Sequence, residues 1–110
     1  MLNMNIEELR LQALSLPEVT EGFPFGDSVI VFKVNKKVFL LLPLDTEKLQ
    51  FNVKCDPDVA IELREQNPCV LPGFHMNKKN WNTIIVDGTL TNKQLTQFVV
   101  DSYDLVKKKK

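Results

Sequence analysis

One segment, residues 74–82 (FHMNKKNWN), concentrates side chains that can bind a ligand. It holds the only histidine and the only tryptophan of the chain, together with two lysines and three asparagines. Lysine ammonium groups can contact phosphates as point charges, and amide groups can donate and accept hydrogen bonds at base edges. Nucleic-acid-binding surfaces use this mixture of basic, amide and aromatic residues. The segment therefore predicts a local binding surface.

The same residues also have ordinary structural explanations. Trp81 begins an apolar stretch, so its ring is expected to pack in or beside the core. His75 has no carboxylate or cysteine close to it in the sequence, which favours a structural hydrogen-bonding role over catalysis. Lys78 and Lys79 can form a solvated turn, and asparagines in loops are frequent turn formers. The binding hypothesis therefore depends on how folding arranges these side chains.

The sequence contains no recognisable catalytic constellation. It lacks the GxSxG, P-loop, GxGxxG and HExxH motifs. Cys55 and Cys69 are 14 residues apart, and with a single histidine they fall short of the four ligands that a zinc site needs. A nucleophilic pair of either cysteine with His75 would lack an orienting third residue. We therefore expect a non-catalytic protein without a metal or a cofactor.

The charge distribution limits where an anion could bind. The formal net charge is zero, but residues 107–110 supply four of the 14 basic residues. The rest of the chain carries 10 basic and 14 acidic residues, a net charge of −4. A grip on nucleic acid by the whole domain is therefore excluded, and a local patch is needed. Besides the lysines of residues 74–82, such a patch could include Lys33, Lys36, Lys37, Asn52 and Lys54.

Composition indicates a single globular domain. The 110 residues are 44% apolar and 25% charged, close to the average of soluble domains. A chain of this size buries roughly two thirds of its unfolded surface and needs no disulfide. The longest apolar run, residues 38–42, is too short to span a bilayer, and we expect the first residues not to act as a signal peptide. We expect one cytoplasmic domain over residues 1–110, monomeric and without a membrane partner.

Capping signals predict three helices. Asn5 followed by Glu8 begins the first, over residues 6–16, and Pro17 ends it. Asp56-Pro57 begins the second, which Pro68 ends. Thr91 with Gln94 begins the third, whose apolar positions recur at helical spacing through residue 106.

Four β-strands are predicted between the helices. Residues 29–34 and 37–42 form a hairpin around the two-residue turn Asn35-Lys36. Residues 49–55 alternate strictly, which indicates a half-exposed strand with Gln50, Asn52 and Lys54 on its polar face. A fourth strand spans residues 81–86. The order helix, three strands, helix, strand, helix (α-β-β-β-α-β-α) indicates a two-layer α+β fold, a mostly antiparallel sheet covered by helices.

Two segments are predicted to lack regular structure. Residues 18–27 contain Gly22, Pro24 and Gly26, which are typical of a loop. The two phenylalanines of this loop, Phe23 and Phe25, are expected to fold inward. Residues 69–80 are also predicted as a loop, with a short extended piece at residues 70–71.

Three stretches resemble the MmcQ/YjbR family of small bacterial proteins. They are residues 14–26 (LSLPEVTEGFPFG), 54–57 (KCDP) and 72–83 (PGFHMNKKNWNT), within a match over about residues 5–106. The resemblance implies a CyaY-like (frataxin-like) α+β fold and the family's label of DNA-binding protein, associated with a double wing of loops and strands. Carried onto this chain, it implies these nucleic-acid-binding residues: Lys54, His75, Asn77, Lys78, Lys79 and Asn82.

Three functional hypotheses follow. The leading one is a non-catalytic DNA-binding protein in which Lys54, Lys78 and Lys79 neutralise phosphates while His75, Asn77 and Asn82 supply hydrogen bonds. The alternative is a domain that binds a small molecule or a protein partner in a polar pocket around His75 and Trp81. A metal handler of the frataxin type is suggested by the fold alone.

Overall fold

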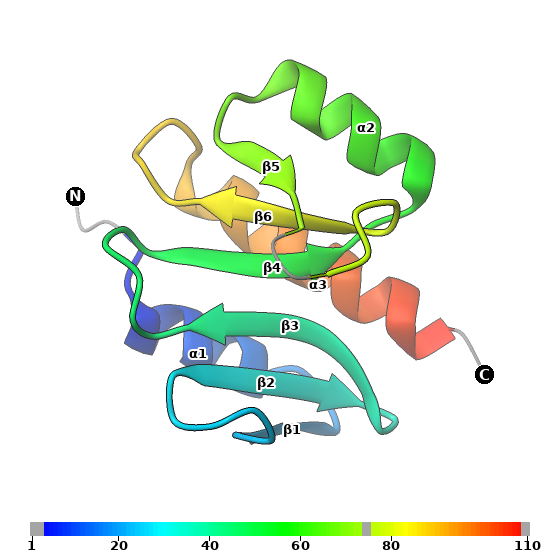
Figure 1. The fold of residues 1–110 in the computed structure, drawn as a ribbon. Helices are drawn as coiled ribbons and strands as arrows, with labels where there is room; N and C mark the ends of the chain where they lie inside the picture. Colours follow the sequence, from blue (N-terminus) through cyan, green and yellow to red (C-terminus); the bar gives the residue numbers. More distant parts are fainter. Residues whose placement is uncertain (1–3, 74–75, 109–110) are drawn as a thin grey trace.

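The structure, a computed structural model, describes residues 4–73 and 76–108. These residues form an antiparallel six-stranded sheet and three helices (Figure 1). The strand order across the sheet is β1-β2-β3-β4-β6-β5. In chain order the elements are α1 (Ile6–Leu14), β1 (Val19–Gly22), β2 (Val29–Val34), β3 (Lys37–Pro43), β4 (Gln50–Lys54), α2 (Pro57–Gln66), β5 (Val70–Pro72), β6 (Trp81–Ile85) and α3 (Asn92–Lys108).

Local signals for the helix starts and the hairpin are confirmed. The Asn5 side chain accepts a hydrogen bond from the Glu8 backbone N–H at 2.8 Å. At the start of α3, the Gln94 N–H donates to Thr91 Oγ1 at 3.1 Å and the Thr91 N–H donates to Gln94 Oε1 at 2.8 Å. This reciprocal arrangement is a capping box. Asn35, at a φ of 53°, and the residue after it, at 66°, form the tight hairpin turn that antiparallel strands favour.

The predicted element order is wrong at both edges of the sheet. The segment expected to be an irregular loop contains β1, and the extended piece expected at residues 70–71 is the paired strand β5. β1 pairs only with β2, and β5 pairs only with β6. Glu18, at a φ of 66°, turns the chain into β1. Edge strands are short and half exposed, so they need no clear apolar alternation.

The main core lies between the sheet and two helices that cross one of its faces. Figure 1 shows α1 and α3 behind the sheet, and buried side chains of both join the core. Tyr103 of α3 meets Phe39 of β3 edge to face, with 5.5 Å between ring centroids. The third helix, α2, packs against β5 and β6. The α+β prediction is therefore confirmed. In the part of the chain that the structure describes, no helix is long and apolar enough to cross a membrane.

No described helix covers the opposite face of the sheet, which we call the open face. Paired residues on neighbouring strands point to the same side, so the register defines one row across this face. The row runs Gly22, Val31, Leu41, Asn52, Thr83 and Leu71. A small second apolar cluster of Val31, Leu41 and Trp81 lies here, with Met76 packed against it.

A β-bulge interrupts the regular strand pairing near the ends of β2 and β4. The register between β2 and β3 shifts at Phe32/Lys33, and consecutive Phe39 and Leu40 both point into the core. The ladder between β3 and β4 stops there, and the Ser102 hydroxyl of α3 bridges the gap. It donates to the Phe39 carbonyl at 2.6 Å and accepts from the backbone N–H of Lys54 at 2.9 Å. The bulge thereby holds the end of β4, where Lys54 lies.

Candidate functional site

The pairing register brings four lysines to one end of the sheet. Lys33 lies near the end of β2, and Lys54 is the last residue of β4, opposite Trp81. Lys36 occupies the turn between β2 and β3, and Lys79 lies in the loop before β6. In Figure 1 this turn and this loop are on the same side of the molecule. We call this group the lysine end: Lys33, Lys36, Lys54 and Lys79.

The lysine end carries four positively charged groups, and the Glu18 carboxylate lines the same hollow as Lys33 and Lys36. Among the described residues, none of its four ammonium groups forms an ion pair or a hydrogen bond. The nearby carboxylate of Glu21 on β1 is held by Arg10 of α1, at 2.8 Å from Nε and 2.6 Å from a terminal nitrogen. The hydrogen bond from Arg10 lowers the pKa of the Glu21 carboxyl. Arg10 therefore compensates Glu21, and the lysines remain available to an anion.

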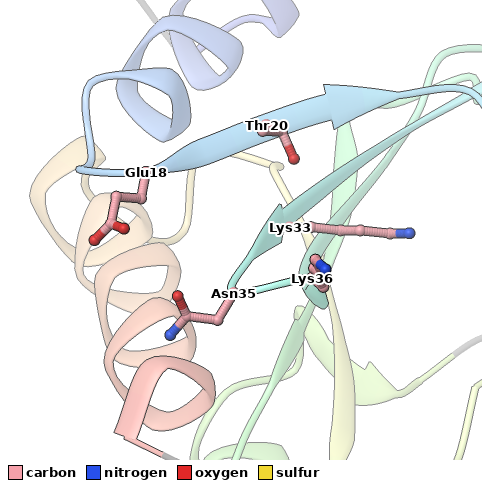
Figure 2. A pocket seen from close by; sticks show the side chains of 5 residues that line it. All are labelled: Glu18, Thr20, Lys33, Asn35 and Lys36. Atoms are coloured by element: carbon pink, nitrogen blue, oxygen red, sulfur yellow. The ribbon is translucent and has the colours of Figure 1, made fainter.

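Two of these lysines line a shallow hollow beside the hairpin turn. It has a volume of about 330 Å³ and is lined by Glu18, Thr20, Lys33, Asn35 and Lys36. In Figure 2 the Lys33 side chain extends away from the Glu18 carboxylate and the Asn35 amide, which point to the other side. The hollow therefore presents lysine nitrogen to the open face.

The described part of the 74–82 segment is a tight loop. The Asn77 side chain accepts from the Lys79 N–H at 2.9 Å, and its carbonyl accepts from the Trp81 N–H at 2.9 Å. The Lys78 ammonium donates to the Gly73 carbonyl at 3.1 Å. Asn77 and Lys78 therefore shape the loop, while Lys79 extends from it. His75 lies outside the described residues.

Asn82 is not on the surface. Its side chain is fully buried between β6 and α2, where it accepts from Arg64 Nε at 2.7 Å and donates to the Ala60 carbonyl at 3.2 Å. A terminal nitrogen of Arg64 donates to the Lys78 carbonyl. Asn82 was predicted to bind a ligand. In this position its hydrogen bonds instead help to join α2, β6 and the loop before β6. The alternation of side chains along β6 turns it away from the open face.

Trp81 lies in the small cluster of the open face, as expected for a packed ring. Only 8% of its surface is exposed, because Val31 and Leu41 pack with it. Gly73 pairs with it, donating its N–H to the Trp81 carbonyl at 2.8 Å. The ring therefore anchors the loop to the sheet and offers little surface to a ligand.

A larger cleft on the open face went unrecognised in the sequence. It measures about 590 Å³, with an apolar floor of Val29 and Leu41 and with Phe25 and Met76 among its lining residues. The polar residues that line it are Ser28, Asp45, Thr46, Gln50 and Asn52. Five of the ten residues that line the cleft come from loops, whose contribution no periodicity in the sequence reveals. The alternating polar residues of β4 were the one available signal.

Asn52 is more enclosed than the predicted half-exposed strand suggested. It is 5% exposed, and its Oδ1 accepts a hydrogen bond from the Thr83 hydroxyl. Its Nδ2 has no acceptor among the described residues, yet no sealed side-chain polar atom in that part of the chain lacks a partner. Nδ2 is therefore not sealed from solvent, and Asn52 lines the cleft.

The expectation that Phe23 and Phe25 fold inward is wrong. Phe23 is 49% exposed and Phe25 is 72% exposed. They lie in the connection between β1 and β2, where the chain turns through Gly26 at a φ of 104°. The main core lies on the other face of the sheet, so these rings project where no described helix covers them.

The pKa values of both cysteine thiols are raised, which disfavours the reactive thiolate form. Burial, with a smaller contribution from Asp101, raises the pKa of the Cys55 thiol to about 11. Burial also raises the pKa of the Cys69 thiol. Thiols with raised pKa values stay protonated near neutral pH and are inert. Within residues 4–73 and 76–108 no group of three or more histidine, cysteine or carboxylate side chains is placed to hold a metal ion.

Two solved structures share this fold. A Deinococcus radiodurans protein, described as containing domain DUF419, superposes with a TM-score of 0.90 at 36% sequence identity, over 96% of this chain and 80% of that one. A Pseudomonas syringae protein superposes with a TM-score of 0.81 at 25% identity, over 94% of this chain and 99% of the other.

Sequence relatives extend over nearly the whole chain. The protein named uncharacterized protein YbdF from Escherichia coli O157:H7 is 33% identical over 100 residues, which are 91% of this chain and 82% of YbdF. Uncharacterized protein YjbR from Escherichia coli strain K12 is 28% identical over 100 residues, covering 91% and 85% of the two chains. The family model described as YjbR matches residues 14–105. The chain therefore belongs to the YjbR family.

Proposed function

We propose that this protein binds DNA without catalysing a reaction, and that the lysine end provides the contact. The observation that carries the proposal is the gathering of Lys33, Lys36, Lys54 and Lys79 at one end of the sheet without ion-pair partners among the described residues. These lysines are far apart in the sequence. Ammonium groups gathered at one end of the sheet are suited to contact successive phosphates of a nucleic-acid backbone.

Some of the remaining candidate residues contact the DNA in this proposal, and others position the loop. Lys79 extends from the loop and reaches a phosphate, whereas Lys78 contributes less because its ammonium group also holds the Gly73 carbonyl. The family resemblance also assigns binding to Asn77, which shapes the loop, and to His75, which lies outside the described residues. Asn82 acts indirectly, because it fixes the position of the loop through Arg64.

The proposed contact predicts weak, salt-dependent binding. Neutralising three or four phosphates gives a slope of about −3 for the logarithm of the association constant against the logarithm of salt concentration. Raising salt from 50 to 200 mM then weakens binding on the order of 100-fold. The acidic remainder of the domain adds no attraction.

The test is a salt series with charge-matched variants. In Lys33→Gln/Lys54→Gln the slope should become shallower by about 2, and affinity at 50 mM salt should fall at least tenfold. Lys48→Gln/Lys93→Gln removes the same charge from the connection before β4 and from the first turn of α3, and it should bind like the wild type. Equal losses in both variants would show that only net charge matters, and the assignment of the lysine end would be wrong.

The alternative pocket around His75 and Trp81 has less support, because the Trp81 ring is largely covered by Val31 and Leu41. We also propose that the architecture is CyaY-like (frataxin-like). The side-by-side terminal helices α1 and α3 on one face of an antiparallel sheet support this relationship. Two free, partly or fully buried cysteines fit a cytoplasmic setting.

A further inference from the structure

Hollows on the open face follow the strand β2 away from the lysine end. The hollow of Figure 2 shares Thr20 and Lys33 with a second one of about 320 Å³, which Phe23 and Val31 also line. The cleft of about 590 Å³ continues the series. It is lined by Val29, which lies two residues before Val31 on β2, and by Phe25. We call this series of hollows the furrow.

The chemistry of the furrow changes along its length. Two residues along a strand span about 7 Å, so Lys33, Val31 and Val29 mark successive steps of that size. Lysines stand at one end, and the exposed rings of Phe23 and Phe25 stand above the apolar middle. A charged groove that follows a backbone, combined with aromatic rings on which bases stack, is how proteins bind single-stranded nucleic acid.

The cleft is also lined by a side-chain amide that can donate a hydrogen bond to a ligand. Asn52 is 5% exposed, and its Nδ2 lacks an acceptor among the described residues while lining the cleft. A base edge offers carbonyl and ring-nitrogen acceptors to such an amide. Asp45, at the end away from the lysines, repels phosphate and accepts hydrogen bonds from exocyclic amino groups. Two lysines against the single carboxylate of Glu18 line the hollow of Figure 2, which favours phosphates there and leaves the cleft to the bases.

We propose that the furrow binds a single strand of nucleic acid, with bases stacked on Phe23 and Phe25 and one base edge hydrogen-bonded to Asn52. The inference rests on the proposed function, because the lysine end supplies the phosphate contacts. A duplex keeps its bases stacked on one another, so it can reach the lysines but cannot place a base against the rings. The protein therefore prefers single strands to duplexes.

The first experiment compares a fluorescent 12-nucleotide single strand with its duplex by anisotropy at 50 mM salt. The wild type should bind the single strand at least tenfold more tightly. Phe23→Ala/Phe25→Ala should lose at least tenfold for the single strand and be unchanged for the duplex. The control Leu11→Ala/Ile61→Ala removes two similarly exposed apolar side chains from α1 and α2 and should bind as the wild type.

The outcomes separate the two proposals. If Lys33→Gln/Lys54→Gln weakens binding of both nucleic acids while the phenylalanine variant changes neither, the DNA-binding surface stands and the furrow proposal is overturned. If the wild type binds neither nucleic acid at 50 mM salt, both proposals fail. The phenylalanine rings are exposed, so their removal should leave the circular dichroism spectrum and the unfolding midpoint unchanged.

A second readout follows the amide itself. The side-chain Nδ2 resonance of Asn52 in a ¹⁵N-labelled protein should shift on addition of the 12-nucleotide strand. An abasic strand of equal length carries the same phosphates and should leave this resonance unmoved. A shift of equal size with the abasic strand would overturn the assignment of a base to the cleft.

Discussion

Nε of Arg64 on α2 donates a hydrogen bond to Oδ1 of Asn82 on β6 at 2.7 Å, inside a contact where Asn82 is fully buried. Another nitrogen of the same guanidinium reaches the Lys78 carbonyl. One arginine therefore ties the second helix to the sheet and to the loop that presents Lys79. The amide of Asn82 completes the arrangement by donating to the Ala60 carbonyl.

Replacing Asn82 should destabilise the fold. Asn82→Ala removes the partners of the Arg64 Nε and the Ala60 carbonyl, and an unsatisfied buried polar group costs about 1–3 kcal/mol. We expect the free energy of unfolding to fall by about 2–4 kcal/mol in urea denaturation, since two partners are lost. Gln97→Ala removes an exposed side-chain amide from α3 and should cost less. Equal losses of unfolding free energy in the two variants would contradict the role of Asn82 in joining α2, β6 and the loop.

The hydroxyl of Ser102 should matter in a similar way. It joins the Phe39 carbonyl to the Lys54 N–H where the β-bulge interrupts the ladder. Ser102→Ala leaves both backbone groups without this partner and should lower the free energy of unfolding by about 1–3 kcal/mol. Hydrogen exchange at the Lys54 amide should become faster, whereas Ser28→Ala, an exposed serine, should leave that amide protected. Unchanged exchange in Ser102→Ala would show that the bridge is dispensable.

Gly73 should tolerate no side chain. A Cβ at this position would lie 2.7 Å from Trp81 Cβ and 2.9 Å from the Trp81 carbonyl oxygen. Gly73→Ala must push β6 and the loop apart, and we expect a loss of about 1–3 kcal/mol in unfolding free energy, with altered tryptophan fluorescence. Gly22→Ala is the matched control, because its nearest contact is Pro24 Cδ at 4.0 Å. A stable Gly73→Ala with unchanged emission would refute the close contact.

The pair of Arg10 and Glu21 should make stability depend on pH. The hydrogen bond from Arg10 lowers the pKa of Glu21 in the folded state, so its contribution is present above the unfolded pKa of about 4.3. That contribution is lost as the pH falls through the folded pKa. Urea denaturation should therefore show Glu21→Gln less stable than the wild type at pH 7, with the difference disappearing in acid. Glu65→Gln, an exposed glutamate of α2, should show no such pH-dependent difference.

Much of the architecture was predictable because its causes are local. The capping pairs Asn5 with Glu8 and Thr91 with Gln94 lie within one helical turn, and the Asn35-Lys36 turn joins adjacent strands. Such signals depend on short-range hydrogen bonds and backbone preference, which neighbouring residues set. The edge strand β1 escaped prediction and β5 was predicted only as a short extended piece, because each depends on pairing with one partner strand.

Dependence on distant parts of the chain also limited the prediction of the candidate site. Chemically identical asparagines at 52 and 82 face opposite sides of the sheet, one lining the cleft and the other held beneath α2. Residue type indicated that the lysines and amides could bind, whereas the rings of Phe23 and Phe25 were expected to fold inward. Which of them share a surface depended on strand register, on the bulge near Lys33 and on the helix positions. Those are long-range contacts, so no stretch of sequence encodes them alone.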